Sequence, residues 1–94
     1  MNACLILAHN ESKFIEKNVT EVISLFELVI VVNDGSTDDT KDILENLTYD
    51  NLKIINNQKN LGAGKSLEIG INEFKNSSCN NLIKIDGDGQ FKLS

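Results

Sequence analysis

The 94 residues of the chain are 40% hydrophobic and 24% charged, as expected for one ordinary globular domain or part of one. Nine basic and fourteen acidic residues give a net charge of -5, which argues against nucleic-acid binding because that requires a basic face. The sequence lacks an apolar run of the roughly 18 residues that a membrane helix needs and lacks the basic start of a signal peptide. We therefore expect a cytoplasmic protein with reduced thiols at Cys4 and Cys79.

Strand-like and helix-like segments alternate along the chain. Short apolar runs predict strands over residues 3–7, 28–32, 52–55 and 82–85. Helical spacing predicts three helices between them, whose buried faces carry first Ile15, Val19, Val22, Ile23 and Phe26, then Ile43, Leu44 and Leu47, and last Leu67, Ile71 and Phe74. We expect Asn10 to cap the first helix, with Glu11 in its first turn, and Ser36 or Thr37 to cap the second, with Asp38 and Asp39 at its positive end.

This order of elements, βαβαβαβ, predicts an α/β fold with a parallel sheet, right-handed crossovers and helices on both faces. A strand in such a sheet has to be covered on both faces. The sequence ends soon after the fourth predicted strand and leaves little to cover it. We therefore expect residues 1–94 to form a single, truncated domain that is marginally stable or self-associates through its open sheet edge.

Polar loops rich in Asp, Asn and Gly follow three of the predicted strands. They have the sequences "AHNES", "NDGSTDDT" and "DGDGQ". Ligands of open α/β sheets bind at the carboxyl ends of the strands, so these loops predict one polar site. Asp34 could accept a hydrogen bond from a base or ribose, or could form a local turn beside a helix cap. His9 could contact a base or be an ordinary loop residue.

A fourth loop precedes the third helix and ends in Gly64-Lys65-Ser66, which matches the end of a phosphate-binding loop. That motif also needs a glycine where this chain has Lys59, and it belongs after the first strand of a domain. A phosphate-loop NTPase is therefore disfavoured. Lys65 could still reach a diphosphate as a point charge, or could be a solvated residue of the first helical turn.

Asp86 and Asp88 flank a glycine after the fourth strand. Oxygen ligands at this spacing suit Mg²⁺ or Mn²⁺ bound together with substrate phosphates. Two other motifs share this pattern. A calcium loop fits poorly because Gln90 and Phe91 occupy its fifth and sixth positions. A haloacid-dehalogenase-like phosphatase has its Asp-x-Asp near the start of the domain and followed by Thr, where this chain has Gln90.

Four segments in this order resemble the signatures of family 2 glycosyltransferases, the group that includes dolichyl-phosphate-mannose-synthase-like enzymes. The segment "LAHNE" resembles Pro-Ala-Tyr-Asn-Glu, with Leu7 and His9 as departures. The segment "VVNDGSTDDT" resembles Val-Asp-Asp-Gly-Ser-Thr-Asp, "NLGAGKSLEIGI" resembles Asn-x-Gly-x-Gly-x-Ala, and "DGDGQ" resembles Asp-Ala-Asp-Gly-Gln. The resemblance covers nearly the whole chain, although Phe91-Lys92 replaces the usual His-Pro.

The resemblance implies the N-terminal, Rossmann-like half of a GT-A fold with strand order 3-2-1-4. It implies that Ala8 and Glu11 flank the nucleoside and that Asp34 binds the base. It further implies that Asp86 lies near the ribose and that Asp88, in a DXD motif, is the ligand of a Mg²⁺ or Mn²⁺ ion that bridges to the diphosphate. His9 and Lys65 complete the expected nucleotide-binding set.

The implied function is donor binding in an inverting glycosyltransferase that uses a UDP-sugar or GDP-sugar. The acceptor, which could be a glycan, a lipid or a protein, is unknown, and the catalytic base is expected beyond Ser94. We therefore expect residues 1–94 to be inactive alone, and the full-length protein could be membrane-associated. Two alternatives stay open at this stage: a nucleotide-binding module without transfer activity, and a haloacid-dehalogenase-like phosphatase.

Overall fold

A computed structural model of the chain describes residues 1–86. It contains seven elements in the predicted alternating order, and their bounds are β1 Asn2–Ala8, α1 Ile15–Val22, β2 Leu28–Asp34, α2 Thr40–Glu45, β3 Leu52–Asn57, α3 Ala63–Lys75 and β4 Asn81–Asp86. Each strand extends beyond the apolar run that predicted it, mostly into the polar residues at its carboxyl end. Among these described residues, no helix is both long enough and apolar enough to cross a membrane.

The four strands form one parallel sheet in the order β3-β2-β1-β4. This confirms the predicted α/β fold class and strand order. The direction in which successive strands are added to the sheet reverses between β1 and β4. The register there pairs Leu7 of β1 with Asp86 of β4. On the other side, Ala8 pairs with Asn33 of β2. The carboxyl ends of the strands, where the polar residues lie, therefore meet at one edge.

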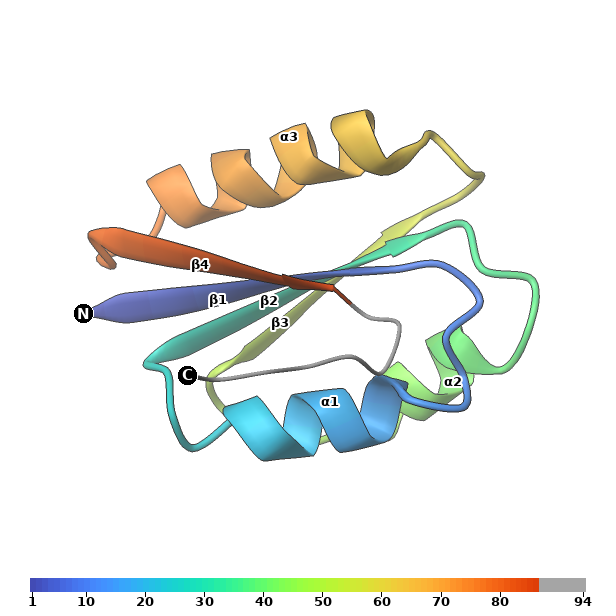
Figure 1. Cartoon of the computed structure of the whole chain (residues 1–94), viewed down its shortest axis with the longest axis horizontal. Coiled ribbons are helices and arrows are strands. Elements are labelled where there is room, and N and C mark those ends of the chain that lie inside the picture. The colour runs from blue at the N-terminus through green and yellow to red at the C-terminus, as the bar shows by residue number, and fades with distance from the viewer. Residues whose placement is uncertain (87–94) are drawn as a thin grey trace.

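Helices cover both faces of the sheet, with α1 and α2 on one face and α3 on the other (Figure 1). The middle residues of the central strands are apolar at successive positions. Their side chains alternate between the two faces of the sheet, and helices cover both faces. One cluster packs under α1 and α2, and its strand members include Cys4, Ile6, Val29 and Val31. The other packs under α3 and contains Leu5, Ile30 and Val32.

Helix α3 approaches the sheet closely because small residues form the middle of its contact face. Ser66 and Gly70 are buried, and a Cβ atom added to Gly70 would lie 2.5 Å from Cδ1 of Leu5. Leu67 and Phe74 pack on the core as predicted. The prediction for Ile71 was wrong in detail, because Ile69 occupies the third apolar position of that cluster. The small residues shift the contact face relative to the apolar stripe.

Both predicted helix caps were wrong. Helix α1 begins at Ile15 rather than beside Asn10, and α2 begins at Thr40 rather than beside Ser36 or Thr37. Neither helix has a side-chain hydrogen bond at its N-cap. The polar groups that looked like caps are used between loops instead: Asn10 has φ 54° and accepts a hydrogen bond from the Thr37 amide at 2.8 Å.

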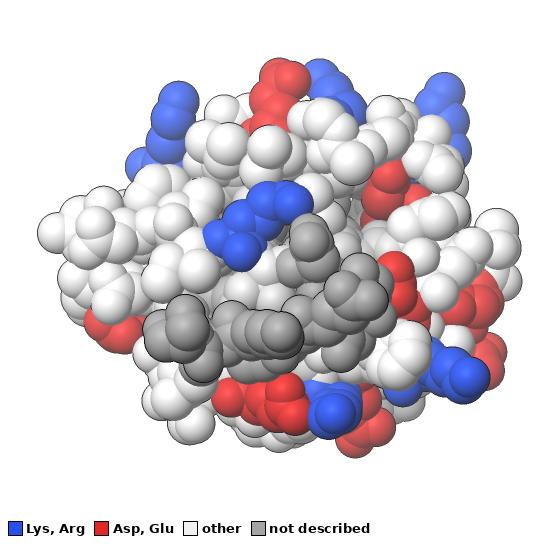
Figure 2. All heavy atoms as spheres, in the orientation of Figure 1, with Lys and Arg blue, Asp and Glu red and all other residues white. Residues whose placement is uncertain are grey.

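One face of the molecule shows how the charged side chains of the described residues are distributed. On the face shown in Figure 2, the lysines lie apart from one another and are interspersed with carboxylates.

Candidate functional site

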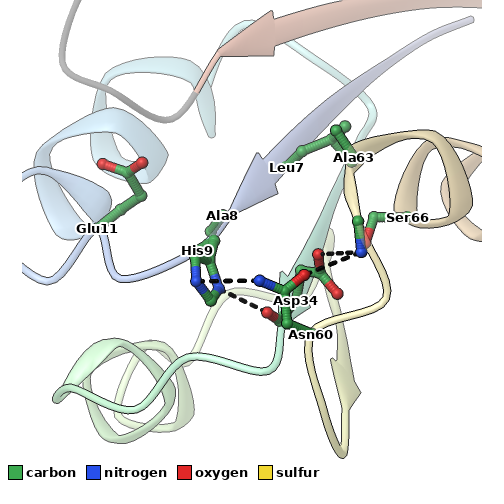
Figure 3. A pocket seen from close by; sticks show the side chains of 9 residues that line it. Leu7, Ala8, His9, Glu11, Asp34, Asn60, Ala63 and Ser66 are labelled. Carbon is green, nitrogen blue, oxygen red and sulfur yellow. Dashed lines mark hydrogen bonds between the residues drawn. The ribbon is translucent and has the colours of Figure 1, made fainter.

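A cavity of about 330 Å³ opens at the carboxyl edge of the sheet, and Figure 3 shows it from close by. This volume lies within the usual range for small-molecule pockets, roughly 300–1,000 Å³. Residues from β1, β2, α3 and the loops that follow β1 and β3 line it: Leu7, Ala8, His9, Glu11, Asp34, Asn60, Gly62, Ala63 and Ser66. The cavity therefore brings together four residues of the predicted nucleotide-binding set, which are Ala8, His9, Glu11 and Asp34.

Asp34 ends β2 and anchors the loop between β3 and α3. The residue is only 5% exposed. Oδ1 accepts hydrogen bonds from the amide of Leu61 at 2.7 Å and from Nδ2 of Asn57 at 3.0 Å. Oδ2 accepts one from the amide of Gly62 at 2.9 Å. An ionised carboxylate offers roughly four acceptor positions, and these three hydrogen bonds, together with the Ser66 side chain, engage most of them.

The environment of Asp34 favours the ionised carboxylate. Burial by itself would raise its pKa, because desolvation disfavours charge. Four hydrogen-bond donors outweigh this effect and hold the pKa below its ordinary value of 3.8, namely the amides of Leu61 and Gly62 and the side chains of Asn57 and Ser66. The side chain is therefore an anionic acceptor at neutral pH.

Gly35, the next residue, lets the β3–α3 loop lie directly against the end of β2. It has φ +64°, and an added Cβ atom would lie 2.3 Å from the carbonyl carbon of Lys59 and 2.4 Å from the amide nitrogen of Asn60. Both the backbone conformation and the close approach exclude a side chain here. The contact places Asn60 at the cavity.

A second set of hydrogen bonds ties the β1–α1 loop to the loop before α2. Thr40 is fully buried, and its Oγ1 accepts from the amide of Glu11 at 3.0 Å and donates to Oδ1 of Asp38 at 2.5 Å. Asp38 also accepts from the amide of Ser12 at 3.3 Å. Desolvation by itself would raise the pKa of Asp38. Its hydrogen bonds to Thr40 and Ser12 outweigh this effect and lower the pKa to about 2.

Of the other predicted site residues, Lys65 and Asp86 belong to described elements and Asp88 does not. Lys65 is not among the lining residues, and its Nζ lies 3.6 Å from Oε1 of Glu68. The backbone of Asp86 pairs with Leu7, which lines the cavity. Asp88 lies outside the described residues, and within residues 1–86 there is no group of three His, Cys, Asp or Glu side chains that could hold a metal. The metal expectation therefore depends on Asp88.

Sequence reasoning missed several residues that build the cavity. Asn60, Gly62 and Ser66 belong to the segment "NLGAGKS", which carried a family signature but was assigned no contacts apart from Lys65. Asn57 was missed as well. The sequence feature that could have pointed to Asn57 is a polar residue at the end of an apolar strand, and in the structure this residue is in register with Asp34.

A second cavity of about 460 Å³ lies on the other side of the same sheet edge. The pairs Asp34–Asn57 and Asn33–Asn56 occupy successive register positions, so their side chains point to opposite faces. Nδ2 of Asn33 donates to Oδ1 of Asn56 at 3.0 Å. Polar residues line this second cavity almost throughout, and Asp34 is not among them.

A parallel sheet of this order, with helices on both faces and a cavity at the carboxyl ends of β1 and β2, defines a Rossmann-like α/β domain. Residues 3–93 match the family described as Glycosyl transferase family 2, and the chain belongs to that family. This confirms the resemblance and the transferase class.

Curated relatives agree with the family match. A dolichyl-phosphate beta-glucosyltransferase of Trichomonas vaginalis is 29% identical over 102 residues, which cover 95% of this chain and 29% of the relative. An uncharacterized glycosyltransferase of Haemophilus influenzae is 37% identical over 95 residues, covering 96% of this chain and 28% of the relative. A poly-beta-1,6-N-acetyl-D-glucosamine synthase of Staphylococcus aureus is 32% identical over 88 residues, covering 89% and 21%. The chain thus spans less than half the length of these relatives.

Proposed function

We propose that this chain is the donor-binding part of an inverting glycosyltransferase that uses a UDP-sugar or a GDP-sugar. The observation that carries the proposal is the position of Asp34, an ionised acceptor in the wall of a ligand-sized cavity at the carboxyl ends of β1 and β2. Membership of the family supports glycosyl transfer as the reaction class.

In this proposal the cavity holds the nucleoside. Asp34 accepts a hydrogen bond from the base, and Ala8, His9 and Glu11 flank the nucleoside. Ser66 lines the same cavity, and its Oγ accepts a hydrogen bond from Nδ2 of Asn57 at 3.1 Å. A pyrimidine or guanine ring presents an N–H group that an ionised carboxylate can accept, and such a charge-assisted hydrogen bond contributes roughly 1.5–3 kcal/mol.

The diphosphate would lie toward the end of β4, because Asp86 pairs with Leu7 at the edge of the cavity. We propose that Asp86 lies near the ribose and that Asp88 holds Mg²⁺ or Mn²⁺. When bound, such an ion offsets the negative charge of the leaving diphosphate. Lys65 could add a positive charge only after leaving Glu68, so we propose a minor role for it.

The acceptor stays open within this proposal. One relative is named for transfer involving dolichyl phosphate and another for a polymer of N-acetylglucosamine, so the family accommodates chemically different acceptors. The residues that bind the acceptor and deprotonate its hydroxyl are proposed to lie in a part of the protein beyond the donor cavity.

A nucleotide panel tests the proposal. UDP, GDP, ADP and pyrophosphate would be titrated into the purified protein by calorimetry, with and without Mn²⁺, and ATP hydrolysis would be followed in parallel. We expect UDP or GDP to bind at least tenfold more tightly than ADP and pyrophosphate, a difference of about 1.4 kcal/mol. Equal affinities for all four ligands, or rapid hydrolysis of ATP, would favour a general phosphate-binding site or an NTPase instead.

A further inference from the structure

The ring of His9 lies where the end of β2 meets the two loops of the cavity, and both of its nitrogens face protein atoms. Nδ1 lies 2.7 Å from the carbonyl oxygen of Asp34. A carbonyl oxygen only accepts hydrogen bonds, so Nδ1 carries a proton and donates it. The protonation state of Nε2 is then decided by the groups that this second nitrogen faces.

Nε2 faces the amide side chains of two asparagines. Nδ2 of Asn60 lies 3.3 Å away and Nδ2 of Asn10 lies 3.5 Å away. The orientation of each amide is fixed by its oxygen, because Oδ1 of Asn60 accepts from the amide of Gly62 at 2.9 Å and Oδ1 of Asn10 accepts from the amide of Thr37. Turning either amide over would place two N–H groups against each other. Nε2 is therefore surrounded by donors and fits only as an acceptor.

We propose that neutral His9, with its proton on Nδ1, is a positioning residue for the nucleotide cavity. It accepts a hydrogen bond from Asn60, and Asn60 in turn accepts from the Gly62 amide, which also donates to Oδ2 of Asp34. Protonation of Nε2 sets an N–H group against the amide of Asn60 and loosens the chain His9–Asn60–Gly62. The consequence for nucleotide affinity rests on the proposed function, whereas the loop response does not.

The sign of the pH dependence follows from this geometry. The chain His9–Asn60–Gly62 needs Nε2 of His9 as an acceptor and is lost when that nitrogen carries a proton, a difference that a comparison over the interval from pH 8 to pH 5 tests. The ring is exposed enough for solvent to exchange its proton. Cavity binding should therefore weaken with falling pH.

Other charged groups on the surrounding elements have to be separated from His9. They are Glu11 on the same loop, Asp34 at the end of β2, Asp38 and Asp39 before α2, Lys59 after β3 and Lys65 in α3. Asp34 and Asp38 stay ionised over this interval because their pKa values lie below the ordinary one. Glu11 lines the same cavity, so a Glu11→Gln variant serves as the control for its titration.

The test follows the ligand-free protein by NMR. The nitrogen shifts of His9 report its tautomer directly, and the exchange rate of the Gly62 amide is compared between wild type and His9→Gln at each pH. Glutamine can accept from Asn60 without titrating, so the ratio removes the intrinsic pH dependence of exchange. We expect exchange in wild type to rise about threefold relative to this variant between pH 8 and pH 5, the effect of losing one modest hydrogen bond. Glu11→Gln should keep this response, and His9→Phe should lose it.

A second arm measures uridine and guanosine, which lack a titrating phosphate. Their affinity for wild type should fall about threefold relative to His9→Gln over the same interval. A Gly62 response without nucleoside binding would support His9 as a positioning residue and count against the proposed function. A wild-type tautomer with the proton on Nε2 at pH 8, an absent Gly62 response, or an equal response in His9→Phe would each overturn the inference. The tautomer measurement uses only wild-type protein, so it decides even if a variant fails to fold.

Discussion

The last residue of β2 and the loop that follows it supply two aspartates with different tasks. Asp34 and its donors Asn57, Leu61 and Gly62, here the Asp34 junction, hold the β3–α3 loop and form a wall of the cavity. Asp38 and its partners, here the Asp38 junction, hold the β1–α1 loop and do not line the cavity. Both pKa values are lowered by hydrogen bonds, so a lowered pKa alone does not identify a ligand-binding carboxylate. Position relative to the cavity separates them.

The comparison also shows why one short motif is so rich in polar residues. The stretch from Asp34 to Thr40 connects to a preceding loop and a following loop at the same time. Loops gain order from such connections at the cost of conformational entropy. Under the proposed function, binding and loop assembly are coupled at Asp34 but not at Asp38, and variants can separate the two effects.

The largest expected effect is the loss of stability in Gly35→Ala. The variant would combine a left-handed backbone conformation with an overlap against the backbone of Lys59 and Asn60. We expect a loss on the order of 3 kcal/mol in the free energy of unfolding, measured by urea denaturation. Gly64→Ala is the matched control, because its added methyl group meets nothing within 4 Å in a helical turn. An equal loss in both variants would mean that the packing against Gly35 contributes little.

Asp34→Asn should have the next largest effect and should change both stability and binding. An amide in place of the carboxylate sets an N–H group against one of the backbone donors of the β3–α3 loop. We expect about 2 kcal/mol of lost stability and about tenfold or more weaker UDP or GDP binding. Asp50→Asn removes the same charge from an exposed position and controls for net charge. Unchanged binding in Asp34→Asn would limit this residue to a role in loop assembly.

A smaller effect is expected from acid titration of the two junctions. Both carboxylates have lowered pKa values in the folded protein, so each stabilises it fully above the ordinary value of 3.8 and loses that contribution as the pH falls through the lowered one. For Asp38 this loss extends down to about pH 2. The double variant Asp34→Asn, Asp38→Asn should therefore lose less stability than wild type between pH 4 and pH 2. A parallel loss in both proteins would assign acid sensitivity to other groups.

Much of the fold could be predicted from local patterns, and much of the site could not. Apolar runs marked the strands because buried parallel strands are continuously apolar, as in Val29–Val32. Strand order came with the resemblance to the family. The task of Asp34 as a loop anchor was not predictable locally, since its donors lie 23 to 28 residues further along the chain.

The two wrong helix caps have the same cause. Asn10 and Ser36 are good capping residues in isolation, yet they hydrogen-bond to each other's loops across a sequence distance of 26 residues. The misjudged face of α3 differs in kind. There, Gly70 fits against Leu5, and a contact face formed by small residues leaves no apolar periodicity to detect.

The central claim is that the cavity walled by Asp34 binds the nucleoside of a sugar nucleotide, whereas the Asp38 junction only supports the loops. Calorimetric titration of UDP and GDP into wild type, Asp34→Asn and Asp38→Asn at pH 7.5 with Mn²⁺ tests it most directly. The account predicts that one of the two nucleotides binds wild type, that Asp34→Asn weakens it about tenfold or more, and that Asp38→Asn changes it less than about twofold. Equal losses in both variants, or binding of neither nucleotide to wild type, would contradict it.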